Sequence, residues 1–96
     1  MISITLSGDL KKGQLEAREN GNMAGILTYS QEEANHITIH HTEVNPQFKG
    51  NGVGKKLFME AVEFARKNNV KIKPECTFAA SMFEKNGNAR DVLVAS

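Results

Sequence analysis

The stretch that most constrains this chain is a glycine-rich loop, Lys49-Gly50-Asn51-Gly52-Val53-Gly54-Lys55-Lys56, which separates a strand-like pattern from a helical one. The first turn of a helix carries backbone N–H groups that have no partners within the helix. The helix dipole adds roughly half a positive charge at the same end. Glycine has no Cβ atom, so a ligand can approach the backbone closely. The loop is therefore predicted to bind an anion, and phosphate is the anion that such loops commonly hold.

Four segments before the loop alternate apolar and polar residues, which is typical of strands with one buried face. They cover residues 2–6, 14–18, 23–29 and 37–44, and a polar loop is expected at 31–35. Asn20-Gly21 lies between the second and third segments. This dipeptide tolerates the positive φ angles of a tight hairpin turn. The first half of the chain is therefore predicted to be an antiparallel meander.

The pattern changes to a helical one after the loop. One stripe of apolar residues recurs at helical spacing, which predicts a helix of about four turns: Val53, Leu57, Ala61 and Ala65. Residues 70–73 read as a short strand, and Thr77 is the expected N-cap of a second helix over 78–85. Residues 92–94 fit either an edge strand or a tail. A strand, a helix and a strand in succession predict a parallel crossover, so the expected class is α+β, a meander followed by a β-α-β-α unit in one mixed sheet.

Length and composition limit the classes of function. A chain of 96 residues fits a single domain spanning 1–96. The net charge of +1 gives no overall field that would favour nucleic acid or a membrane surface, and no apolar run approaches the length of a membrane span. Cys76 is the single cysteine, so no internal disulfide can form. These features predict a cytoplasmic protein without nucleic-acid or membrane partners.

Three kinds of phosphate loop compete for the glycine-rich stretch. A Walker A loop needs four residues between its first glycine and Gly-Lys, followed by Ser or Thr; here three residues separate Gly50 from Gly54, and Lys56 replaces the hydroxyl residue. A dinucleotide fingerprint needs Gly-x-Gly-x-x-Gly with an acid about 20 residues later. Glu75 falls near that distance, but the glycine spacing differs and too little chain follows to build a doubly wound sheet.

The third kind fits best. Residues 44–57 resemble the acetyl-CoA-binding motif of the GNAT superfamily of N-acetyltransferases, Gln/Arg-x-x-Gly-x-Gly/Ala at a strand-to-helix transition. Lys49 stands at the Gln/Arg position, which is a departure, and Gly52 and Gly54 stand at the required glycines. The segments 41–44 and 76–79 also resemble the small, single-domain GNAT-like subfamily. The resemblance covers roughly residues 23–87.

This resemblance implies a binding site for acetyl-CoA as acyl donor, without a metal. In the GNAT fold two neighbouring parallel strands splay apart at the glycine loop, and the pantetheine arm lies in the cleft. Glu43, Val44 and Asn45 are accordingly expected to border the pantetheine. The pyrophosphate is expected to lie on Lys49, Gly50, Asn51, Gly52, Val53, Gly54 and Lys55, and the thioester is expected beside Phe78, Met82 and Phe83.

Acetyl transfer to an amine needs a group that removes a proton from the amine, and the departing thiolate can take a proton. His41 and Glu43 are two residues apart in a strand, so their side chains share one face and either could be the base. Cys76 precedes a helix, where the dipole would stabilise a thiolate. It could protonate the leaving thiolate or accept the acyl group. Each residue also has a purely structural reading, as a surface side chain or a small buried one.

Only residues 8–13 separate the first two expected strands. Typical GNAT enzymes are longer and have a helical region there that helps to hold the acceptor. The resemblance therefore implies an N-acetyltransferase whose amine acceptor, a small molecule, protein or peptide, is not identified by the sequence. The alternative is a non-catalytic acyl-CoA-binding or sensing module. A third reading is an interaction module that binds another phosphate. The chain is expected to be a monomer or a weak homodimer.

Overall fold

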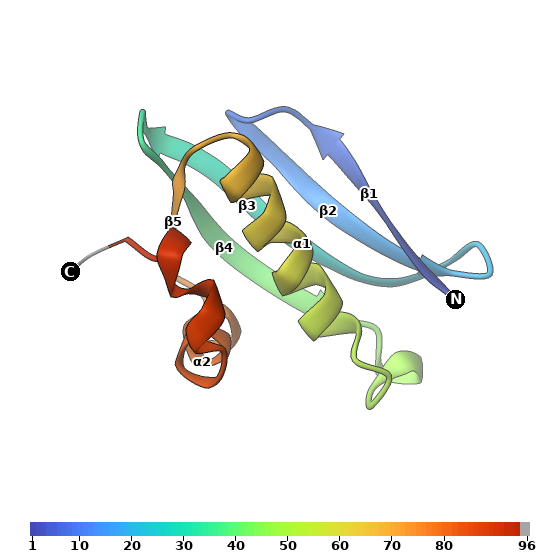
Figure 1. Ribbon diagram of the computed structural model, residues 1–96. Coiled ribbons are helices and arrows are strands. Elements are labelled where there is room, and N and C mark those ends of the chain that lie inside the picture. The colour runs from blue at the N-terminus through green and yellow to red at the C-terminus, as the bar shows by residue number, and fades with distance from the viewer. Residues whose placement is uncertain (95–96) are drawn as a thin grey trace.

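Five strands lie side by side in the order in which they occur in the chain, in a computed structural model that describes residues 1–94 (Figure 1). They are β1 (Ile2–Gly8), β2 (Lys12–Glu19), β3 (Asn22–Glu33), β4 (His36–Val44) and β5 (Lys71–Pro74). The first four pair antiparallel, whereas β4 and β5 pair parallel. This arrangement confirms the predicted α+β class and mixed sheet.

The hairpin between β2 and β3 turns at Asn20 and Gly21, whose φ angles are 52° and 83°. Both angles lie in the region that Asn and Gly tolerate best, as the dipeptide predicted. β3 then runs to Glu33, so the polar loop expected at 31–35 is wrong over its first three residues. Strand pairing overrides the polar composition there, because Glu33 pairs with His36 across a much shorter turn.

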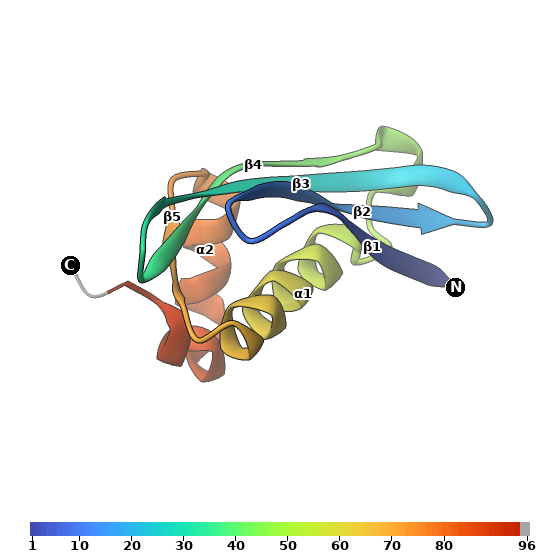
Figure 2. The ribbon, with the colours of Figure 1, turned by 90° about the horizontal axis from the view of Figure 1, so that it is seen from above.

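Two helices cover the same face of the sheet (Figure 2). They are α1 (Val53–Lys67), which packs against all five strands, and α2 (Thr77–Lys85), which packs beside it. The predicted apolar stripe of α1 is buried against the sheet. Phe58 on α1 and Phe83 on α2 meet edge to face, with 4.8 Å between ring centroids. Helices and sheet therefore enclose one core, and the opposite face of the sheet carries mostly polar side chains, with Ile26 among them.

The start of α2 differs from the prediction. Cys76, not Thr77, is the N-cap, and its Sγ accepts the Ala79 N–H at 3.3 Å. The reason is the backbone: Cys76 has φ −86° and ψ 138°, the extended conformation that a cap needs, whereas Thr77 already belongs to the helix.

The segment after α2 is neither a full strand nor a free tail. A short helix η2 (Gly87–Val92) is followed by Leu93, which forms a parallel bridge with Ile72 of β5. No helix in residues 1–94 is long and apolar enough to cross a membrane.

Candidate functional site

The parallel pairing between β4 and β5 stops before the end of β4, and the candidate site lies where the two strands separate. Ile39 and Pro74 form the last parallel pair, and the Glu75 N–H donates to the Ile39 carbonyl at 3.1 Å. β4 continues to Val44, paired only with β3. The two parallel strands therefore separate after Ile39, as the resemblance to the GNAT superfamily implied.

The separated part of β4 presents backbone groups to the opening. The Asn45 N–H donates to Ala24 of β3 at 2.8 Å. Successive residues of a strand direct their N–H and C=O groups to alternate sides. The N–H and C=O groups of Val44 and Thr42 therefore point away from β3, toward the space that β5 has left. An extended ligand can form strand-like hydrogen bonds along this edge.

The glycine-rich loop leads from this edge into α1. Its residues follow the short helix η1 (Pro46–Phe48), and Gly50 and Gly52 have φ angles of 86° and 74°. Most L-residues avoid this left-handed conformation, so glycine is favoured at both positions. Gly52 is the N-cap of α1. The N–H groups of the following turn are consequently free of helical partners and face the same region.

Gly54 is needed for a different reason. A Cβ atom added there would lie 2.7 Å from Cζ of Phe78 on α2, closer than real side chains come. The bare backbone of α1 therefore lets the Phe78 ring lie directly against the loop. This contact joins the glycine loop to α2 across the opening.

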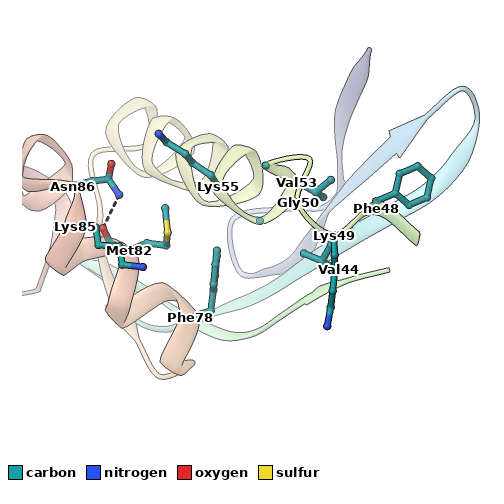
Figure 3. A pocket seen from close by; sticks show the side chains of 12 residues that line it. Val44, Phe48, Lys49, Gly50, Val53, Lys55, Phe78, Met82, Lys85 and Asn86 are labelled. Atoms are coloured by element: carbon teal, nitrogen blue, oxygen red, sulfur yellow. Dashed lines mark hydrogen bonds between the residues drawn. The ribbon is translucent and has the colours of Figure 1, made fainter. Parts of the chain in front are cut away.

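A cavity of about 620 Å³ lies between the loop and α2 (Figure 3). The loop side contributes Lys49 and Lys55, and the α2 side contributes Phe78, Met82 and Lys85. No carboxylate belongs to the described residues that line the cavity. The loop side thus offers two lysines and backbone N–H groups, and the α2 side offers an aromatic ring, a thioether and a third lysine.

The cavity gathers most of the residues that were predicted to bind the donor. Those that line it are Val44, Lys49, Gly50, Gly52, Val53, Gly54, Lys55, Phe78 and Met82. The other four predicted residues are not among those that line it. Glu43 and Asn45 border a separate hollow, Asn51 donates its N–H to the Phe48 carbonyl, and Phe83 is 2% exposed in the core.

Sequence reasoning missed three lining residues, Phe48, Lys85 and Asn86. A signal for two of them was present. Lys85 and Asn86 follow Phe78 by seven and eight residues, the spacing of one helix face. Asn86 is fixed there because its side-chain amide donates to the Met82 carbonyl at 2.8 Å, the dashed line in Figure 3.

The three predicted catalytic residues do not form one cluster. His41 Nε2 lies 3.0 Å from Glu43 Oε2, and these side chains are 58% and 70% exposed. Cys76 is half-buried, with Sγ 3.5 Å from Oγ1 of Thr42. Thr42 is in register with the buried Leu27, so it lies on the helix side of the sheet, whereas His41 and Glu43 lie on the open side. Cys76 therefore lies at the strand opening on the helix side of the sheet, and His41 and Glu43 lie there on the open side.

Comparisons with known proteins agree with this geometry. The profile of the family described as GCN5-related N-acetyltransferase matches residues 14–92. The chain is 28% identical over 85 residues to Protein NATD1 of Xenopus tropicalis, covering 88% of this chain and 78% of that protein.

Solved structures are similar as well. A GCN5-like protein from Staphylococcus aureus has 36% identity and a TM-score of 0.75, with 98% of this chain and 89% of that one covered. An acetyltransferase from Bacillus subtilis, solved in complex with CoA, has 16% identity and a TM-score of 0.74. The superposition covers 91% of this chain and 76% of that one, and at this identity it supports the fold alone.

Proposed function

The chain belongs to the GCN5-related N-acetyltransferase family, and from this premise we propose that it binds acetyl-CoA and transfers the acetyl group to an amine. The observation that carries the proposal is the cationic cavity between the glycine loop and α2. Its loop side suits phosphates, because free helix N–H groups and two lysines lie on that side. Phe78 and Met82 on the α2 side are apolar, which suits the acyl end of the donor.

Different residues at the cavity bind different parts of acetyl-CoA. Lys49, Lys55 and the N–H groups of the first turn of α1 hold the pyrophosphate. The open edge of β4 at Thr42 and Val44 hydrogen-bonds the amide groups of the pantetheine arm. Phe78 and Met82 lie against the thioester, so water is excluded from that end. Acetyl-CoA supplies an activated acetyl group whose C–S bond breaks as the new C–N bond forms.

Protons move through residues on both faces of the opening. On the open face, Glu43 takes the proton of the amine, directly or through a water, while His41 holds the carboxylate through their 3.0 Å contact. On the helix side, the thiol of Cys76 gives a proton to the departing sulfur. The Ala79 N–H then stabilises the sulfur anion of Cys76.

A titration of the protein with acetyl-CoA, followed by amide chemical shifts, tests the binding step. We expect the resonances of Val44, 49–55, Phe78, Met82 and Lys85 to move, while the Asn20-Gly21 hairpin stays unchanged. If the amide resonances of residues 49–55 do not move at millimolar acetyl-CoA, the proposal is wrong.

Turnover is tested by free-thiol release from acetyl-CoA in the presence of a panel of alkyl amines, peptides and proteins. Each product is identified by mass, and Cys76 is checked for acetylation. Transfer to at least one amine is expected.

One observation favours a second candidate, a non-catalytic acyl-CoA-binding module. β1 and β2 are joined by a tight turn with Gly8 opposite Gly13, so the chain has no helical segment there to hold an acceptor. Saturable acetyl-CoA binding without thiol release above the buffer rate, for every acceptor tested, would favour this candidate.

A further inference from the structure

Ser30, His40 and Glu75 converge on the open face of the sheet, outside the cationic cavity. Ser30 Oγ lies 2.6 Å from Nε2 of His40, and the other ring nitrogen, Nδ1, lies 3.6 Å from Oε1 of Glu75. We propose that these residues form a second acyl-transfer site, in which Ser30 is a nucleophile activated by His40 toward small activated acyl esters.

A β-bulge creates this juxtaposition. The β3–β4 register shifts between Thr28, which pairs with His41, and Tyr29, which pairs with Ile39. His40 is the extra residue. Without the bulge, adjacent His40 and His41 would point to opposite faces. With it, both imidazoles lie on the open face, and His40 reaches the hydroxyl of Ser30 on the neighbouring strand.

The two contacts of His40 favour the imidazole tautomer that can act as a base toward Ser30. Glu75 faces Nδ1 and favours the proton there, which leaves the Nε2 lone pair free to accept from the Ser30 hydroxyl. Lys73 Nζ lies 3.8 Å from the other oxygen of Glu75 and orients its carboxylate. The 3.6 Å separation is longer than a hydrogen bond, and such catalytic contacts often tighten when substrate binds.

The arrangement opens into its own cavity, which gives it room for a substrate. Ser30 and His40 line a hollow of about 640 Å³ together with Gln14, Thr28 and Lys12. A small acyl group fits in this volume. Lys12 contributes a positive charge to the same hollow, which favours the negative charge that develops on a carbonyl oxygen under attack.

The chemistry balances with water as the co-reactant. Ser30 Oγ bonds to the acyl carbon while its proton passes to His40 Nε2. The bond from the acyl carbon to the leaving oxygen or sulfur breaks, and His40 returns the proton to that atom. Water then attacks the acyl-serine with His40 again taking the proton, which releases the acid and restores the Ser30 hydroxyl.

The test uses a small fluorophosphonate, which forms a stable adduct with activated serines, on the intact chain without acetyl-CoA. Intact mass and peptide mapping are expected to place the adduct on Ser30. Ser30→Ala should remove the adduct, and His40→Gln should slow labelling by about 100-fold. His36→Gln is the matched control, because His36 also faces a glutamate, Glu33, at 3.8 Å but lies outside the cavity. It should label at the unchanged rate.

Glu75 acts through His40, so its test needs a readout beyond the rate. Glu75→Gln is expected to slow labelling and to change the imidazole ¹⁵N shifts of His40, which report the tautomer. Glu75→Asp should recover part of the rate. The proposal is overturned if Ser30 is not labelled, if labelling is as fast in folded His40→Gln, or if the adduct lies on other serines. These outcomes leave acetyl-CoA binding unaffected, so failure here is separable from failure of the proposed function.

Discussion

The proposed donor-binding half and the proposed catalytic half of the site, called the donor half and the catalytic half below, are built by different means. The donor half uses backbone: the loop glycines, the start of α1 and the open edge of β4 are fixed by the fold itself. The catalytic half uses a few side chains at the strand opening, and His41 and Glu43 extend into solvent. Backbone recognition tolerates most side-chain changes and fails only when geometry changes. Catalysis by exposed side chains can be lost by single substitutions while the fold and donor binding persist.

The largest effect is expected from a change to the geometry of the donor half. Gly54→Val places branched carbons where a single Cβ would already lie 2.7 Å from the Phe78 ring. The ring or α2 must shift, which costs about 1–3 kcal/mol of stability. Acetyl-CoA binding, measured by isothermal titration calorimetry, should become undetectable.

Gly50→Ala is the control for that experiment. It retains a positive φ but has no atom within 4 Å of the new Cβ, so only the conformational cost of about 1–2 kcal/mol applies. Binding of acetyl-CoA should weaken and remain measurable. Equal loss in both variants would show that the Gly54–Phe78 contact is not what shapes the cavity.

A change in the catalytic half should separate turnover from binding. Glu43→Gln removes the proposed base and is expected to lower kcat by about 100-fold, since positioned bases contribute 10²–10⁴-fold. The Kd for acetyl-CoA should stay within about twofold. Steady-state thiol release and calorimetry give the two quantities. Unchanged kcat would remove Glu43 from the mechanism.

Cys76→Ala tests the other face of the opening by the same two measurements. Loss of the proton donor should lower kcat, and the lost N-cap should lower stability by about 1 kcal/mol. Cys76→Ser is the matched variant, because a hydroxyl can still cap α2 but is a much weaker acid. It should keep the stability and not the turnover. Full turnover in both variants would leave Cys76 with a structural role alone.

A smaller effect is expected at the lysine that sequence reasoning missed. Lys85→Gln removes one cation from the cavity and should weaken acetyl-CoA binding by roughly 3–10-fold, less at high salt. Lys56→Gln is the control, since Lys56 neighbours Lys55 in sequence but does not line the cavity. Binding measured at two ionic strengths distinguishes a direct contact from a change in net charge.

The smallest effect concerns the end of α1 that is remote from the loop. Arg66 donates to both carboxylate oxygens of Asp91, at 3.0 and 2.8 Å, and holds the pKa of Asp91 below its ordinary value of 3.8. A depressed pKa contributes stability above the unfolded value, and that stability is lost as pH falls through the folded value. Asp91→Asn should therefore be slightly less stable than the native chain at pH 7.

The stability difference between Asp91→Asn and the native chain should shrink below about pH 4. Urea unfolding at pH 7, 5 and 3 measures it. Asn88→Ala is a suitable control, because Arg66 uses the backbone carbonyl of Asn88 and not its side chain. A gap that is independent of pH would mean that the ion pair is not its source.

The donor half was predictable because its signals are local. Alternating residues, the Asn20-Gly21 turn and the apolar stripe of α1 each specify a short segment. The glycine spacing together with the strand-to-helix change then specified the loop. Lys85 escaped notice because its role depends on which face of α2 turns toward the loop. That orientation is set by packing, through Phe83 against Phe58 and Phe78 against Gly54.

The catalytic half was less predictable because its arrangement depends on strand register. Period-two alternation correctly put His41 and Glu43 on one face. It could not reveal the bulge that brings His40 to the same face and to Ser30, because nothing local distinguishes an extra residue in His40-His41. It also could not show that Cys76 lies beside Thr42, on the helix side of the sheet. Both facts rest on pairing between residues distant in the chain.

The bridge between Leu93 and Ile72 has a consequence for self-association. Exposed strand edges are templates for pairing with other chains. The Val94 N–H donates to the Ile72 carbonyl at 3.0 Å, so Leu93 and Val94 occupy part of the outer edge of β5, a strand of only four residues. This covering disfavours edge-to-edge aggregation through β5. β1, the strand at the opposite edge, has no such covering within residues 1–94 and is the more open place for a second copy to extend the sheet.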